Sequence, residues 1–235
     1  MALPKLDQPT YTMTVPSTGN EITYRPFVVK EEKILMMAQQ DGDPKAVARA
    51  TKQVIGNCLV SGDLDVNKLA SFDIEYIFLQ LRSRSVGETV DLILPCDECE
   101  TKIEFQINVN DVVVEKKEGI DPNVKLTDDV GIVLRWPEVD DVAELDPKMD
   151  EIDQAFKLIA ICTDSIYDAE NVYSSKDVSR KDIEEWLGNL SQDQFSEIRD
   201  FFENMPKVTL STKLTCPKCQ HETDIKLEGL QSFFS

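Results

Sequence analysis

The chain has 235 residues, with 44 acidic and 25 basic side chains and a formal net charge of −19. This charge disfavours nonspecific binding to nucleic acid or to an anionic membrane, because both surfaces attract the opposite field. No apolar run approaches the ~20 residues that span a bilayer, so we expect a soluble protein with a sizeable core.

The N-terminal part begins with a hairpin pattern and continues as helices. Residues 10–15 and 21–27 alternate as strands around a turn at residues 16–20. Residues 29–40 suit a helix, and Asp43-Pro44 predicts the start of another that reaches residue 59. The next helix, around residues 72–81, is apolar on two faces, so we expect it at the centre of the core.

Two C-x-x-C turns, which we call knuckles, lie far apart in the sequence, at residues 96–99 and 216–219. Alternating apolar and polar residues flank each of them, which predicts two β-hairpins with thiols at their turns. Residues 100–105 resemble residues 222–227 if Gln220 and His221 are treated as an insertion. The pattern indicates a degenerate repeat of one hairpin.

Short strands and helices fill the segment between the knuckles. We expect strands at residues 125–126 and 132–137, and an acidic loop at 138–151 that leads into a helix. That helix, which contains Ile152, is the first of three; the second starts near Ser179 and the third near Ser191, where Gln194 completes a capping box. The expected organisation is one domain, 1–235, with these parts: hairpin 1–30, helices 31–86, knuckle β part 87–135 with 207–235, and helical insertion 136–206.

The knuckles together supply the four thiolates that a structural zinc ion binds in tetrahedral geometry. The expected ligands are Cys96, Cys99, Cys216 and Cys219. Unmetallated thiols remain an alternative. Disulfides are disfavoured because no secretory signal opens the chain. A redox role is disfavoured because reactive C-x-x-C pairs usually begin a helix.

The remaining candidate ligands are weaker. His221, the only histidine, follows Cys219 closely and could replace a thiolate, or could be solvated or support a ligand from outside. Cys58 and Cys162 fall in apolar helical stretches, which favours a role as small core residues.

Motifs of catalysis are missing from the sequence. There is no G-x-G-x-x-G, no G-x-x-x-x-G-K-[ST] and no H-E-x-x-H, and a lone histidine leaves little scope for nucleophilic catalysis. We expect no enzymatic activity and no small-molecule substrate.

Five segments of the chain carry a family resemblance: residues 3–6, 9–11, 16–33, 72–79 and 82–88. They resemble the baseplate hub protein family of T-even-type contractile-tailed bacteriophages. The resemblance is most specific over residues 3–109, and length and layout agree over the whole chain. It implies a role as a hub component or as an assembly factor for the hub, without enzymatic activity.

The sequence thus predicts an α+β protein in which antiparallel hairpins form a zinc-ribbon-like site of four cysteines, packed with five or six helices. Its expected partners are other hub or tail proteins, met in the host bacterial cytoplasm during assembly or in the virion tail baseplate. We expect Leu230, Phe233 and Phe234 to dock on a partner or to fold back onto the core. The alternative function is an acidic zinc-ribbon adaptor of transcription or nucleic-acid machinery.

Overall fold

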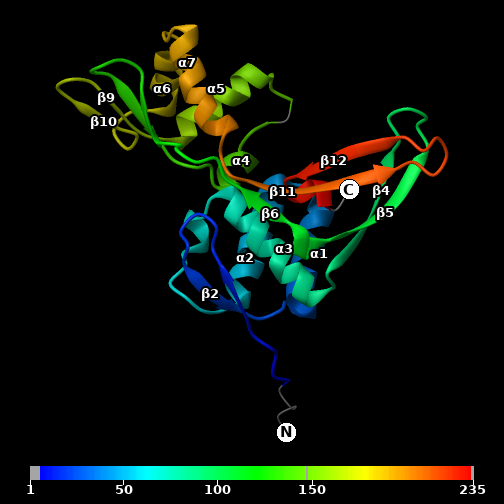
Figure 1. Ribbon diagram of the computed structural model, residues 1–235. Coiled ribbons are helices and arrows are strands. Elements are labelled where there is room, and N and C mark those ends of the chain that lie inside the picture. Colours follow the sequence, from blue (N-terminus) through cyan, green and yellow to red (C-terminus); the bar gives the residue numbers. More distant parts are fainter. Residues whose placement is uncertain (1–5, 147, 234–235) are drawn as a thin grey trace. The chain divides into compact units, whose positions relative to one another are not determined.

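The computed structural model describes residues 6–146 and 148–233 and divides the chain into two compact units (Figure 1). Unit 1 is Met1–Glu115 with Lys207–Ser235, and unit 2 is Lys116–Pro206. All strand pairs of the described residues are antiparallel, and these residues form seven α-helices. The predicted α+β class is therefore confirmed, with one or two helices more than expected.

Unit 1 contains three antiparallel sheets, with strand orders β1-β2-β3, β4-β5 and β12-β11-β6, around three α-helices. Its elements are β1 (Tyr11–Thr14), β2 (Glu21–Tyr24), α1 (Val29–Asp41), α2 (Pro44–Cys58), β3 (Leu59–Ser61), α3 (Ser71–Ser85), β4 (Thr89–Pro95), β5 (Lys102–Asn108), β6 (Val113–Glu115), β11 (Lys207–Thr215) and β12 (Glu222–Glu228), with 3₁₀ turns at Val66–Lys68, Val109–Asp111 and Leu230–Phe233.

The predicted N-terminal hairpin and the two helix starts are confirmed. β1 pairs with β2 from Tyr11↔Tyr24 to Thr14↔Glu21. Gly19 in the turn has a φ of +73°, a conformation that glycine adopts without strain. At α2, the Asp43 carboxylate accepts the N–H of Lys45 at 3.0 Å, and the proline at the first helical position has no N–H to satisfy.

Helix α3 lies in the core of unit 1, as its two apolar faces predict. Phe72, Ile74, Ile77, Leu79 and Leu81 are all at most 2% exposed. The helix contacts the C-terminal part of the chain through β11 and through the 3₁₀ turn Leu230–Phe233. The N-terminal and C-terminal parts of unit 1 therefore contact each other through α3.

Unit 2 contains one four-stranded sheet of order β10-β9-β8-β7 and four α-helices. Its elements are β7 (Asn123–Lys125), β8 (Gly131–Leu134), α4 (Val139–Ala143), α5 (Glu151–Cys162), β9 (Thr163–Tyr167), β10 (Val172–Ser174), α6 (Arg180–Leu187) and α7 (Gln192–Glu203).

The acidic segment before α5 contains the short helix α4, where the sequence predicts only a loop. The carboxylate of Asp141 accepts the backbone N–H of Glu138 at 2.8 Å, which closes a capping box. Residues 138–143 carry too little apolar periodicity to predict a helix, so the cap is the only local signal. The capping box predicted at Ser191 and Gln194 is confirmed at the start of α7.

The core of unit 2 packs the sheet against its helices. Ile132 of β8, Ile159 of α5, Ile183 of α6 and Ile198 of α7 are at most 2% exposed and belong to one cluster. Trp136 stacks on Phe201 of α7, with ring centroids 4.2 Å apart and planes tilted by 7°. Within the described part of the chain, no helix has the length and apolar character needed to cross a membrane.

We expect Phe201→Ala to lower the free energy of unfolding of unit 2 by about 3–5 kcal/mol, because it removes a buried ring and leaves a cavity. Both tryptophans, Trp136 and Trp186, lie in unit 2, so tryptophan fluorescence during urea unfolding reports on that unit. Ile152→Ala is the control, because Ile152 is 69% exposed and its truncation should cost less than about 0.5 kcal/mol. Equal effects of the two variants would contradict the assigned core.

A second prediction concerns Glu75 of α3, which is partly buried. Burial raises the pKa of Glu75 to about 7, against the opposing effect of a hydrogen bond from the Leu230 backbone. The folded state therefore holds the proton more tightly than the unfolded state. This contribution to stability is present below pH 4.5 and is lost as the pH rises to about 7.

We expect Glu75→Gln to stabilise the protein at pH 8 by about 1–3 kcal/mol and to leave stability nearly unchanged at pH 4. The measurement is the difference in unfolding free energy between variant and wild type across this pH range, with the exposed Glu104→Gln as a control. A difference that does not grow with pH would contradict the assigned environment of Glu75.

Candidate metal centre

The first knuckle closes the β4–β5 hairpin. The strands pair up to Pro95↔Lys102, directly beside the first cysteine. The backbone N–H of Cys96 donates to the Thr101 carbonyl at 2.9 Å, and the N–H of Glu100 donates to the Cys96 carbonyl at 2.8 Å. Glu100 has a φ of +55°, which turns the chain back into β5.

The second knuckle closes the β11–β12 hairpin in the same way. The strands pair up to Thr215↔Glu222. The N–H of Cys216 donates to the His221 carbonyl at 2.8 Å, and the N–H of Gln220 donates to the Cys216 carbonyl at 3.0 Å. Gln220 has a φ of +60°.

The two knuckles therefore correspond position by position, and the predicted insertion of Gln220 and His221 is wrong. Gln220 occupies the place of Glu100, and His221 occupies the place of Thr101. The side-chain similarity aligned residue 100 with residue 222, whereas the backbone hydrogen bonds align residue 100 with residue 220. The difference of two residues leaves each side chain on the same face of its strand, which explains why the similarity was misleading.

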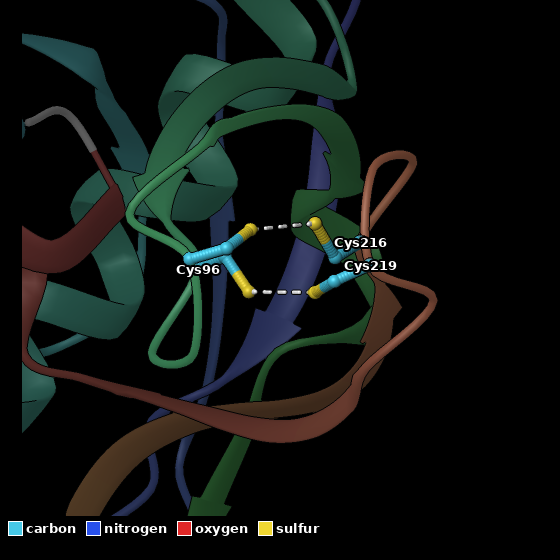
Figure 2. A group of neighbouring side chains, drawn as sticks. Cys96, Cys216 and Cys219 are labelled. Atoms are coloured by element: carbon cyan, nitrogen blue, oxygen red, sulfur yellow. Dashed lines mark hydrogen bonds between the residues drawn. The ribbon is translucent and has the colours of Figure 1, made fainter.

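The four knuckle sulfurs converge on one point (Figure 2). The Sγ atoms of Cys96 and Cys219 are 3.6 Å apart, as are those of Cys99 and Cys216, and all four lie within 4.8 Å of one another. Four sulfurs bound tetrahedrally at ~2.3 Å from one ion would be ~3.8 Å apart. The arrangement thus fits a four-thiolate metal centre, and these four residues could bind a metal.

The thiols have unequal environments. Cys96 and Cys216 are 3% and 1% exposed, whereas Cys99 is half-buried and Cys219 is exposed. Hydrogen bonds from the side chain and backbone of Thr101 lower the pKa of Cys99 to about 6. At Cys219 a hydrogen bond from the His221 backbone lowers the pKa, but desolvation and the neighbouring sulfurs outweigh it and raise the value to about 12. Thiolates 3.6 Å apart repel one another, and a bound cation would offset that repulsion.

The alternatives considered for the thiols are less consistent with this geometry. All six cysteines are free thiols, and sulfurs 3.6 Å apart are not bonded. Both knuckles lie between strands, where no helix dipole activates a thiol. His221 does not belong to the group of potential ligands in the described residues, and its backbone carbonyl supports Cys216.

Cys58 and Cys162 are core residues, as predicted. Each ends a helix, and each is 0% exposed. Burial raises the pKa of Cys58 to about 11 and that of Cys162 to about 12. Both thiols stay protonated at neutral pH and are poor metal ligands.

The structure places the predicted partner-binding residues of the tail in different environments. Leu230 is half-buried at the start of the last 3₁₀ turn, and Phe233 is 0% exposed. Phe234 lies outside the described residues. The burial of Phe233 is the arrangement expected if the tail folds back onto unit 1.

Sequence reasoning missed Thr101, whose hydroxyl lies 3.3 Å from the Sγ of Cys99. This hydroxyl favours the thiolate form of Cys99, the form in which the residue could bind a metal. The available signal in the sequence was the position of Thr101, two residues after the second cysteine of its knuckle, where the second knuckle has His221.

Comparison with known proteins identifies a family. A family model described as "T4 bacteriophage base plate protein" matches residues 8–235. Neither the curated proteins nor the solved structures gave a match. The family match spans both compact units and both knuckles. The chain therefore belongs to the T4 bacteriophage base plate protein family and is a structural protein of the phage baseplate.

Proposed function

We propose that this baseplate protein is a component or an assembly factor of the baseplate hub, that it acts through protein–protein contacts, and that one structural zinc ion holds its two knuckles together. The family match over residues 8–235 supports the baseplate role. The observation that carries the zinc assignment is the convergence of four cysteine sulfurs within 4.8 Å. Other phage tail proteins are its expected partners.

The small amount of apolar packing at the knuckles supports the zinc assignment. The β4–β5 sheet has two strands, and an isolated pair of strands is marginally stable in water. The buried cluster at the hairpin ends consists of Cys96, Ile103 and Cys216, with Cys99 packed against it. A metal would supply the cohesion that so few apolar side chains cannot.

The negative charge of the chain favours binding to other proteins over binding to nucleic acid. The net charge of −19 opposes contact with the phosphate backbone of nucleic acid. A rigid pair of hairpins can present a defined surface to neighbouring subunits. Leu230 and Phe234 remain proposed partner-binding residues, and Phe233 would serve as the anchor that holds the tail on unit 1.

We expect the purified protein to contain one zinc ion per chain, measured by mass spectrometry of the native protein and by elemental analysis. The double variant Cys216→Ser/Cys219→Ser should lose the metal, because two thiolates remain. Chelation should lower the free energy of unfolding by about 3 kcal/mol or more when the metal had been present at about 100 times its Kd. Cobalt should replace zinc and give the absorption of a tetrahedral thiolate site.

Cys58→Ala and Cys162→Ala are the matched controls. Each removes a buried thiol outside the cluster, so each should lower stability while leaving the metal content at one ion per chain. A wild-type protein that holds no metal after purification without chelator, and that takes up none on refolding with zinc, would overturn the zinc assignment.

We expect a tagged full-length chain, purified from phage-infected cells, to recover baseplate hub and tail proteins. The metal-site variant Cys216→Ser/Cys219→Ser should recover less of them than wild type, because the knuckles lose their fixed geometry. Leu230→Asp tests the tail, and Ile152→Asp is an exposed control in unit 2. Mass spectrometry of purified particles then separates a hub component, which is present, from an assembly factor, which is absent.

Recovery of polymerase or nucleic acid in place of tail proteins would contradict the hub proposal and favour a transcription adaptor. Recovery of tail proteins from regions of the particle other than the hub would leave the family assignment intact and reject the hub role.

A further inference from the structure

One arrangement of side chains occurs in both compact units. Arg25 follows β2 in unit 1, and Arg135 follows β8 in unit 2. The backbone N–H of Arg25 donates to the carbonyl of Cys58 at 2.9 Å, and the N–H of Arg135 donates to the carbonyl of Cys162 at 2.9 Å. Each cysteine is the last residue of a helix, so each arginine joins the end of a strand to the end of a helix.

The guanidinium of Arg25 makes three further contacts, and we call this set the arginine clasp. It donates to the carbonyls of Pro26 and Asn57, both at 2.9 Å, and to the Glu31 carboxylate at 3.0 Å. The other carboxylate oxygen of Glu31 accepts the backbone N–H of Val28 at 3.0 Å and caps α1. Glu31 is 0% exposed, and the Arg25 guanidinium balances its buried negative charge.

The guanidinium of Arg135 makes the same contacts in unit 2. It donates to the carbonyls of Trp136 at 3.1 Å and Ile161 at 3.2 Å, and to the Asp141 carboxylate at 2.6 Å. Asp141 accepts the N–H of Glu138 and caps α4. The carboxylate lies six positions after the arginine in both clasps, and the carbonyl comes from the residue before the cysteine in both.

The strands beside the clasps also correspond. β2 pairs with β3 with a register shift between Thr23 and Tyr24, directly before Arg25. β8 pairs with β9 with a register shift between Val133 and Leu134, directly before Arg135. Each pair also has a preceding hairpin partner, β1 or β7, so hairpin, bulge, clasp, helix and third strand follow in the same order twice.

The knuckles extend this correspondence to the end of each copy. A helix follows the third strand in both cases, after the 3₁₀ turn Val66–Lys68 in unit 1 and after β10 and α6 in unit 2, and a knuckle hairpin comes next. Both knuckle hairpins belong to unit 1. The sulfur pairs are crossed, since the first cysteine of one knuckle lies nearest the second cysteine of the other: Cys96 with Cys219, and Cys99 with Cys216. Such reciprocal contacts are the property of a two-fold interface between equal partners.

We propose that the chain consists of two tandem copies of one module, residues 11–108 and 123–228. In this arrangement the two modules of the chain bind each other through their knuckles. The partner of each knuckle in this chain is the knuckle of the other module. The part of the proposal that involves metal rests on the proposed zinc site, whereas the part that involves the clasps does not.

A single clasp could arise independently, because an arginine beside a capping carboxylate is a common arrangement. Independent origin is a poor account of the whole set: a bulge, a clasp, a helix ending in a buried cysteine and a matching knuckle, in one order. The copies differ where the chain can change without disturbing this set. α1 is longer than α4, and β10 and α6 occur only in the second module among the described residues.

The equivalence of the clasps is tested by Arg25→Lys and Arg135→Lys in the full-length chain. Lysine keeps the charge but loses the planar fork that reaches a carboxylate and two carbonyls together. Hydrogen exchange followed by mass spectrometry should show amides exchanging about tenfold faster or more at two places for each variant. These are residues 28–32 and 57–61 for Arg25→Lys, and residues 138–142 and 161–165 for Arg135→Lys.

Arg199→Lys is the matched control, because Arg199 pairs with Glu203 on the surface and is 55% exposed, so its exchange pattern should stay that of wild type. If either lysine variant fails to fold, Glu31→Gln and Asp141→Asn test the same clasps with the arginines present. An effect at one clasp and none at the other, or effects in segments that do not correspond, would overturn the two-module proposal.

The knuckle surface is tested by exchanging residues 96–101 with residues 216–221 in one full-length chain. Equivalent knuckles predict the same Tm and the same metal content as the unexchanged chain. The control is the exchanged chain with one glycine inserted after the second cysteine of each knuckle. This control should have a lower Tm and should bind no metal. Loss of the fold or of metal on simple exchange would reject the two-fold surface. Absence of metal from wild type would instead reject the zinc assignment, while the clasp experiment still decides whether the modules are equivalent.

Discussion

Four cysteine sulfurs from two hairpins lie within 4.8 Å of one another, an arrangement that could hold one metal ion. Sulfurs 3.6 Å apart repel one another when both are charged. Hydrogen bonds with Thr101 lower the pKa of Cys99, whereas at Cys219 desolvation and the neighbouring sulfurs outweigh a hydrogen bond from the His221 backbone and raise the pKa. Other contacts within unit 1 also bring the segments that carry the two hairpins together. Strand β6, which follows the first hairpin, pairs with β11, and α3, which precedes that hairpin, contacts β11.

The family assignment and the geometry explain different properties of the protein. The family model places the chain among T4 baseplate proteins but does not explain why the C-terminal residues 207–233 belong to unit 1. The geometry explains this through the β6–β11 strand pairing, the contact of α3 with the last 3₁₀ turn and the proximity of the thiols. In the proposed two-module arrangement, the knuckles are the contact between copies, and the arginine clasps join the strands to the helices inside each copy.

Local signals in the sequence predicted local structure well. The hairpin at residues 11–24, the caps at Asp43 and Ser191, and the strands on either side of each knuckle all appear in the structure. The convergence of the four thiols followed from their chemistry, because one metal can use four thiolates from anywhere in the chain. Strand partners were harder to predict. β7 and β8 are too short to show which strands they pair with, and they belong to the sheet of unit 2. The correspondence of Arg25 with Arg135 was hidden because the carboxylate differs and backbone carbonyls supply most of the contacts.

The discontinuity of unit 1 has a consequence for the order in which the protein is made. Translation delivers Lys116–Pro206 as an uninterrupted stretch, so unit 2 has all its strands and helices while the ribosome is still working. Among the described strands, β6 pairs only with β11, so it has no strand partner until β11 has been translated. The thiols of the first knuckle likewise lie alone until the second knuckle has been translated. A chain that is released before β11 is made therefore has all the elements of unit 2 but an incomplete unit 1. Closure of unit 1 therefore marks a polypeptide that has been synthesised past β11 and β12.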